Sequence, residues 1–287
     1  MQNKNIVKVA LVQMSMSNDK QSNLDKALNK IKESASKGAD IVCLPELFNL
    51  QYFPQTENDE NFKLAEEIPG PATNAIGRSA KENRIVVVAG SVFEKSKGKF
   101  FNTSVVFDKD GSILGKYSKV HIPHDPYFFE KKYFSSGNEY KVFNTPFAKI
   151  GVLICYDQWF PEAARATALK EAQIIFYPTA IGWFEELRNL EPFSQKRWER
   201  DQCSHASSNG VYVVAANRVG KENKIDFWGN SFVADPFGNV IARATGAKEE
   251  IVMADINLSL IESSREGWGF LRNRMPKTYS SLVERHG

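Results

Sequence analysis

The sequence of 287 residues is 42% hydrophobic and 25% charged, which is typical of a globular protein with a sizeable core. Its 37 basic and 34 acidic residues leave a net charge of +3 and form no basic block, so nucleic acid is not expected as a partner. The N-terminal sequence shows neither a signal-type segment nor an apolar run of membrane length. We therefore expect a soluble, cytoplasmic protein without a membrane partner.

Strand and helix patterns alternate in the first half of the chain. Leu24, Leu28 and Ile31 recur on one face of an amphipathic helix that Gly38 ends. The expected elements of this half are a strand at 6–14, a helix at 18–37, a strand at 40–44, a helix at 70–83, a strand at 84–93, and two strands joined by a turn at 108–111.

The second half repeats this order after an irregular, aromatic-rich stretch at 118–140. Its expected elements are a strand at 148–154, a helix at 161–170, a strand at 173–177, a helix at 192–209, a strand at 211–216, and a hairpin around 235–239. Because βαβ units place helices on the faces of sheets, the two halves predict two mixed sheets. Packing their bare faces together gives an α/β fold, a four-layer α-β-β-α sandwich.

The chain contains no Pro/Gly/Ser-rich linker and no short-period repeat, so a single domain is expected over residues 1–258. Residues 259–287 form a C-terminal extension in which Trp268, Phe270 and Leu271 lie among charges. This extension is consistent with an arm that packs on another subunit, and equally with a surface tail.

Three polar residues, Glu46, Lys119 and Cys155, follow predicted strands at the point where each strand ends. Ligand-binding groups in α/β sheets commonly lie at such ends. A carboxylate at a desolvated sheet edge is a suitable base near neutral pH, although a helix cap or an ion pair is the ordinary role of such a glutamate. A lone lysine at a strand end is ordinarily solvated.

Cys155 occupies a strand-to-helix turn, beside a helix N-terminus expected near Pro161 and Glu162 that would favour the thiolate. A buried, inert thiol is the alternative. Cys43 lies within a strand pattern and Cys203 within a helical pattern, and both are expected to be structural. Three scattered cysteines do not form a disulfide framework.

The histidines do not form a recognisable catalytic or metal-binding pattern. His121, His124 and Asp125 are close in sequence but lack a matching second pair of ligands, while His205 and His286 are distant. No metal site is therefore expected. His205 also lacks the sequence context of a Cys-His hydrolase, so the base for Cys155 must be another residue.

The motifs "LPELF", "GKYSKVHIP" with "FFEKKYF", and "CYDQWFPEAAR" resemble the nitrilase superfamily of carbon–nitrogen hydrolases over about residues 6–256. The resemblance implies the same α-β-β-α sandwich, assembly into homo-oligomers, and hydrolysis without a metal or organic cofactor.

The resemblance also implies a role for each residue of the motifs. Glu46 matches the general base, Lys119 the cation beside the reacting carbonyl, and Cys155 the nucleophile that forms a thioester. The N–H of Tyr156 is a second candidate donor to the oxyanion. Glu130 matches a second glutamate that positions Lys119 or the substrate amine, although a surface role in its charged run is the alternative.

Within the superfamily, "CYDQWFPEAARATAL" and "FYPTAIGW" are most similar to the enzymes that hydrolyse N-carbamoylputrescine to putrescine, CO2 and NH3 in polyamine biosynthesis. The resemblance places Tyr156, Trp159, Trp183 and Glu185 at the site of this small-molecule substrate. In those enzymes Ser-Glu-Pro follows "YPTAIG"; here the acid, Glu185, is displaced by one residue, so that Trp183 and Phe184 can instead shape a less polar pocket.

The sequence leaves the substrate, and the class of protein, open to alternatives. Cys203 and Ser204 replace the usual Gln-Gly before His205, which leaves the fine substrate contacts open. An N-carbamoyl amino acid or an ω-amide is an alternative substrate, and the residues of the motifs do not exclude a nitrile. A non-catalytic or redox-sensing thiol protein is the alternative from another class.

Overall fold

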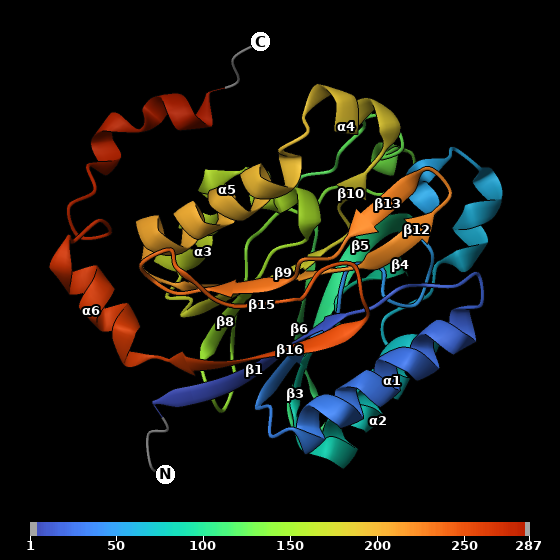
Figure 1. Ribbon diagram of the computed structural model, residues 1–287, viewed down its shortest axis with the longest axis horizontal. Helices are drawn as coiled ribbons and strands as arrows, with labels where there is room; N and C mark the ends of the chain where they lie inside the picture. Colours follow the sequence, from blue (N-terminus) through green and yellow to red (C-terminus); the bar gives the residue numbers. More distant parts are fainter. Residues whose placement is uncertain (1–4, 285–287) are drawn as a thin grey trace.

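The computed structural model describes residues 5–284, and Figure 1 shows two large sheets with helices on their outer faces. His286 and the first four residues of the expected domain lie outside the described residues. The first sheet contains, in spatial order, β16 (Glu250–Asn257), β1 (Ile6–Gln13), β2 (Ile41–Cys43), β3 (Val86–Val88), β5 (Lys99–Phe107) and β4 (Val92–Ser96), with β6 (Ile113–Ser118) also paired to β5. Strands β1, β2 and β3 are parallel, and the remaining pairs are antiparallel.

The second sheet has a parallel centre, β8 to β9 to β11, with antiparallel strands on both sides. Its order is β15 (Val240–Arg243), β14 (Phe232–Ala234), β11 (Tyr212–Asn217), β9 (Ile174–Thr179), β8 (Lys149–Val152) and β7 (Val142–Asn144). A small third sheet joins β10 (Gly182–Trp183), β13 (Ile225–Trp228) and β12 (Val219–Glu222).

Two helices cover each large sheet (Figure 1). Helices α1 (Lys20–Ser36) and α2 (Pro71–Asn83) cover the first sheet, and α3 (Pro161–Leu169) and α5 (Ser194–Asn209) the second. Asp19 caps α1, since its side chain accepts from Ser22 N at 2.5 Å. The predicted four-layer sandwich is confirmed.

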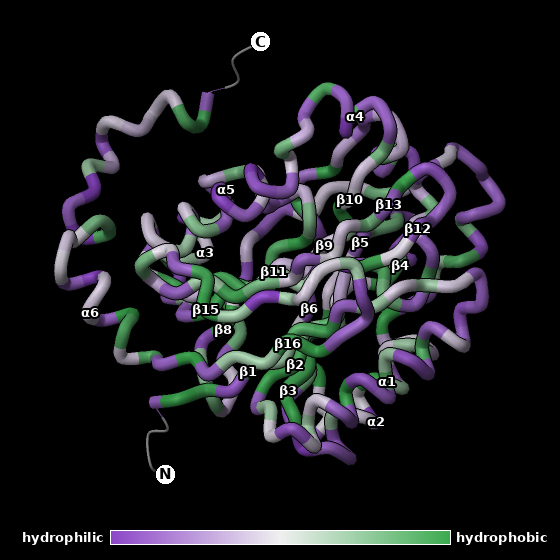
Figure 2. The backbone as a smooth tube through the Cα atoms, in the orientation of Figure 1, coloured by the Kyte–Doolittle hydropathy of each residue, from purple (hydrophilic) through white to green (hydrophobic). Residues whose placement is uncertain are grey.

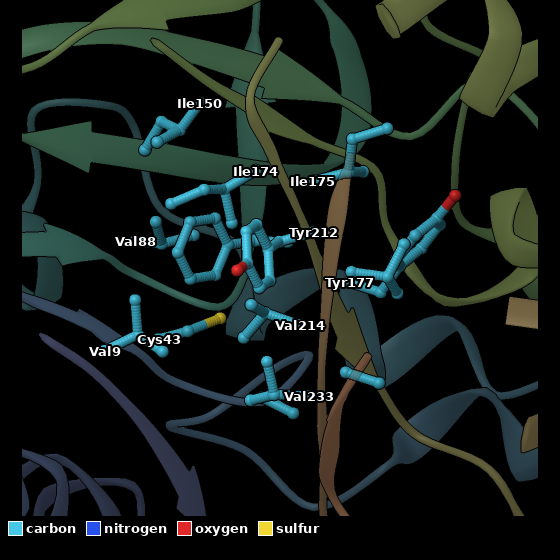
Figure 3. Packing of buried hydrophobic residues seen from close by; sticks show 14 of the residues in the cluster. Val9, Cys43, Val88, Ile150, Ile174, Ile175, Tyr177, Tyr212, Val214 and Val233 are labelled. Atoms are coloured by element: carbon cyan, nitrogen blue, oxygen red, sulfur yellow. The ribbon is translucent and has the colours of Figure 1, made fainter. Parts of the chain in front are cut away.

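Alternation along the strands divides the core between the layers. Val9 of β1 and Cys43 of β2 face the second sheet, where Figure 3 shows them near Val214 and Val233. Ala10 and Val12 of β1 point to the opposite face of the sheet and pack with residues of α1 and α2. In Figure 2 the most hydrophobic segments accordingly lie in the central strands, and polar segments line the outer helices.

The structure differs from the predicted elements at 84–93 and in elements that were not predicted, among them β7, β10, β12, β13 and β16. The strand expected at 84–93 is two strands, because Gly90 adopts a left-handed backbone (φ 48°) and its Cα lies so close to the Pro45 carbonyl that a Cβ would be 2.0 Å from that oxygen. The segment 250–257 was not predicted as a strand, yet β16 pairs with β1 along its whole length.

The C-terminal extension begins with α6 (Ser259–Gly267) and continues along the outside of the molecule beyond α3 and α5 (Figure 1). Trp268 is 79% exposed, and Phe270 stacks beside it. Assembly through this arm stays a prediction. Within residues 5–284, no helix has the length and apolar character needed to cross a bilayer.

Candidate active site

The three predicted residues lie on tight turns at the ends of strands. Glu46 follows β2 and precedes Leu47, whose backbone is left-handed (φ 48°); Cys155 follows β8 and is itself left-handed (φ 43°). Such backbone is unfavourable for residues with a side chain and persists where surrounding contacts hold it. Lys119 directly follows β6. Each side chain is thus presented from a rigid sheet edge.

Lys119 is the centre of a fully buried charge network. Its Nζ donates to Glu46 Oε1 at 2.9 Å and to both carboxylate oxygens of Glu130 at 2.8 and 2.7 Å. Tyr52 donates its hydroxyl to Glu130 at 2.6 Å, and Asn102 donates its amide to Glu46 Oε1 at 2.7 Å. Among the described residues, the buried Glu46 Oε2 has no hydrogen-bond partner, so this oxygen is available to take a proton.

The pKa values of Lys119 and Glu130 are both raised, but for different reasons. Burial lowers the pKa of Lys119, but the charges of Glu130 and Glu46 outweigh it and raise that pKa well above its usual range. Burial, together with the charge of Glu46, raises the pKa of Glu130 to about 7 in spite of Lys119. The ammonium of Lys119 is therefore permanent at neutral pH, while Glu130 is poised to exchange a proton.

Cys155 is buried beside these charges. Burial raises the pKa of its thiol well above the usual value, Glu46 and Glu130 raise it further, and Lys119 acts in the opposite direction. The helix predicted near Pro161 does begin there, as α3, but the expectation that its N-terminus favours the thiolate is wrong, because burial and the two carboxylates raise the pKa. Cys155 itself starts a short 3-10 helix, Cys155–Trp159. A thiol that is neutral at rest needs a base during its attack.

We expect the thiol of Cys155 to be protonated at neutral pH, which ultraviolet absorbance of the thiolate can test. The difference spectrum between the native chain and Cys155→Ser should contain no thiolate signal at neutral pH, because a buried thiol next to two carboxylates resists ionisation. The signal should grow only above the ordinary thiol range. A full thiolate signal at or below neutral pH would contradict the assignment.

Asp157 connects the turn at Cys155 to the segment after Lys119. Its buried carboxylate accepts hydrogen bonds from Ile154 N at 2.9 Å and from Tyr117 Oη at 2.7 Å. It also binds His121, through the backbone N at 2.9 Å and the ring Nδ1 at 2.8 Å. His121 thus has a structural partner, and its ring stacks on Phe160 at 3.6 Å.

The other histidines of the sequence analysis also have local partners. The ring of His124 packs edge-on against Phe129, and Nε2 of the buried His205 lies 2.8 Å from the carbonyl oxygen of Gln158. Burial lowers the pKa of His205. Across residues 5–284, no group of three or more His, Cys, Asp or Glu side chains is arranged to hold a metal ion.

A cavity of about 490 Å³ opens onto Cys155 and Glu130. Tyr156 and Trp159, predicted at the substrate site, line this cavity. Trp183 and Glu185 lie in a neighbouring depression, and Phe184 separates the two hollows because it lines both. The ring of Trp183 contacts Trp228 edge-on at 4.9 Å, and Trp228 in turn lines the cavity.

Four further charged residues line the cavity and belong to no motif that predicted a substrate site: Asp125, Glu191, Arg197 and Asp201. The sequence near Asp125 indicated only a candidate metal ligand. The guanidinium of Arg197 lies 3.3 Å from Glu191, 3.7 Å from Asp201 and 5.4 Å from the ring of Trp159. The sequence carries only one local signal for this group, the i, i+4 spacing of Arg197 and Asp201 on a helix.

Comparisons with known proteins identify the family of this chain. A family model described as carbon-nitrogen hydrolase matches residues 8–266. N-carbamoylputrescine amidase of Arabidopsis thaliana is 40% identical over 98% of this chain and 96% of its own length, and citrullinase of Francisella tularensis is 38% identical over 98% and 99%. The crystal structure of a carbon-nitrogen hydrolase from Helicobacter pylori G27, 38% identical, has a TM-score of 0.94 and covers 98% of this chain and 100% of that chain. The chain belongs to the carbon–nitrogen hydrolase family.

Proposed function

We propose that this enzyme hydrolyses N-carbamoyl amines, and N-carbamoylputrescine foremost, to the free amine, CO2 and NH3. The observation that supports the proposal is the cavity itself, which is lined by Cys155 and Glu130 and also by several further carboxylates. Formation of putrescine would place the reaction in polyamine biosynthesis in the cytoplasm. The name of the Arabidopsis relative supports this choice of substrate.

The proposed mechanism begins when Cys155 Sγ attacks the ureido carbonyl and Glu46 Oε2 takes the thiol proton. The tetrahedral oxyanion accepts hydrogen bonds from Lys119 and the N–H of Tyr156, and one such donor contributes about 3–4 kcal/mol. Glu46 then returns the proton to the leaving nitrogen as the C–N bond breaks. Water, activated by Glu46, hydrolyses the thioester, and the carbamate formed releases CO2 and the second amine.

The charge of the cavity supports a cationic distal group. Asp125, Glu191 and Asp201 together outweigh the single guanidinium of Arg197. A substrate that ends in an ammonium is attracted to this surplus of negative charge, whereas one that ends only in a carboxylate is repelled. The side chains of Glu191 and Asp201 are each 41% exposed, so solvent screens the attraction.

A second candidate is a ureido amino acid such as citrulline, which carries both an ammonium and a carboxylate at its distal end. Arg197 favours it, because a guanidinium that stacks on an aromatic ring is well suited to bind a carboxylate. The name of the Francisella relative points to the same substrate. Arg197 already pairs with Glu191, however, and a substrate carboxylate has to compete with that pair.

Ammonia release from a panel of substrates tests the proposal. We expect the highest kcat/KM with N-carbamoylputrescine, a lower value with citrulline, and little activity with an N-carbamoyl amino acid lacking a distal amine, an ω-amide or a nitrile. Glu191→Gln should raise KM for N-carbamoylputrescine about threefold to tenfold and leave kcat nearly unchanged, since it removes an attraction present in ground and transition state alike.

Glu185→Gln and Glu186→Gln are the matched controls, because both acids line the neighbouring depression. A rise in KM with Glu185→Gln but not with Glu191→Gln would assign the distal ammonium to Glu185 instead. Absence of ammonia release from N-carbamoylputrescine, with clear release from the ω-amide, would contradict the proposed substrate.

A further inference from the structure

A buried ion pair contacts the segment that carries Glu46, although the pair itself lies on a segment with no catalytic motif. Arg218, which joins β11 to β12, is fully buried and pairs with Glu222 at the end of β12. The guanidinium also lies over the ring of Phe227, 4.9 Å from its centroid. Burial of an ion pair costs desolvation free energy, and an apolar pair of equal volume often stabilises a fold equally well. Stability alone therefore does not explain why an ion pair lies here.

The pair binds the main chain of the segment that carries Glu46. Arg218 donates to the carbonyl oxygen of Leu50 at 3.0 Å and to that of Glu46 itself at 3.4 Å. Glu222 accepts from the backbone N of Tyr52 at 2.7 Å. The ion pair thus holds the segment 46–52 at its beginning, its middle and its end. Ile225 and Phe227 of β13 belong to the same buried hydrophobic cluster as Phe93 of β4.

Both ends of this segment enter the catalytic network. Leu47, directly after Glu46, has the left-handed backbone that turns the chain, and its own N–H is bound by Ser91 Oγ at 2.9 Å. Tyr52 donates its hydroxyl to Glu130, which in turn binds Lys119. A shift of the segment would therefore move the base and, through Tyr52, the carboxylate that holds the ammonium.

We propose that Arg218 and Glu222 are positioning residues that fix the direction of the Glu46 carboxylate and the register of Tyr52 on Glu130. The proposal rests on the role of Glu46 as the base in the function proposed above. Arginine is needed because its planar fork reaches two carbonyl oxygens and a carboxylate at once, whereas a lysine ammonium in the same place keeps the charge without that geometry.

Arg218→Lys is the decisive variant, and Arg265→Lys is its matched control. Arg265 also donates to two backbone carbonyls, of Gly210 at 3.0 Å and Ala172 at 2.9 Å, but it lies on α6. We expect Arg218→Lys to lower kcat about 100-fold, which is the effect of a small misplacement of a catalytic group, and to change KM less than about threefold. Arg265→Lys should retain activity within about twofold.

A second readout keeps this test independent of the substrate. The rate at which iodoacetamide alkylates Cys155, followed by mass spectrometry of the peptide, depends on a base for the neutral thiol. The rate should fall in Arg218→Lys and not in Arg265→Lys. If the native chain hydrolyses no ureido substrate, the proposed function fails while this rate still decides the role of Arg218.

The proposal is overturned if Arg218→Lys lowers the melting temperature but leaves both kcat and the alkylation rate unchanged. Should Arg218→Lys not fold, Glu222→Gln replaces it, because one amide oxygen has to serve the two donors, Arg218 and Tyr52, that the carboxylate serves with two oxygens. Native kcat and alkylation in folded Glu222→Gln would likewise overturn the proposal.

Discussion

Replacing Cys155 by alanine is expected to lower ammonia release by roughly 10⁴-fold or more, with the fold retained. The thiol is the sole nucleophile in the proposed mechanism, whereas its removal takes away little packing and leaves no charge unpaired. Steady-state rates on the preferred substrate and circular dichroism measure the two effects. Cys203→Ala is the matched control, since this half-buried thiol lies on α5 and its pKa, raised by burial to about 11, marks it as inert. Full activity in Cys155→Ala would refute the assignment of the nucleophile.

The same position also tests whether backbone strain is stored at the site. Cys155 has a φ of 43°, a region that glycine adopts at little cost and alanine does not. We expect Cys155→Gly to exceed Cys155→Ala in free energy of unfolding by about 1 kcal/mol, since the two variants differ by one methyl group at a left-handed residue. Equal stability in denaturant would show that the turn is not strained.

The sequence sufficed for residues that follow strong local patterns. Glu46 and Cys155 each come after an apolar strand, and Lys119 follows the mixed strand β6. All three lie where a strand ends, a common location of ligand-binding groups in α/β sheets, so the sequence indicated them as site candidates. Tyr52, Asn102 and Arg218 enter the same network from segments whose own spacing indicates nothing about it. Their roles arise only when distant segments pack together, which no local window contains.

Two errors have the same origin in long-range structure. The strand β16 pairs with β1 at the opposite end of the chain, so no residues near 250–257 in the sequence indicate its partner. The thiolate expected at Cys155 is contradicted even though α3 begins at Pro161 as predicted, because burial and the charges of Glu46 and Glu130 raise the pKa of the thiol. Burial of a given side chain is a property of the whole fold.

Lys119→Met is expected to destabilise the folded chain by about 3–5 kcal/mol near neutral pH, and to reduce kcat by about 10²–10³-fold. The catalytic loss follows from removal of a donor to the oxyanion. The loss of stability follows because Lys119, Glu46 and Glu130 are all fully buried, and without the ammonium two carboxylates face each other away from water. Lys149→Met is the control at the surface, since Lys149 on β8 is partly exposed and pairs with the exposed Glu171, and such a pair contributes about 0–1 kcal/mol.

The dependence of this loss on pH distinguishes charge from packing. Glu130 has a pKa raised from 4.5 to about 7 in the folded chain, so it binds its proton more tightly folded than unfolded. Its contribution to stability is therefore complete below the unfolded value and is lost as the pH rises through about 7. Removing Lys119 takes away the one charge that opposes this shift and raises the pKa of Glu130 further. The deficit of Lys119→Met in urea denaturation should consequently be smaller near pH 5 than near pH 8, by about 1 kcal/mol or more. An equal deficit at both values would mean that lost packing of the lysine stem, and not the two uncompensated carboxylates, is responsible.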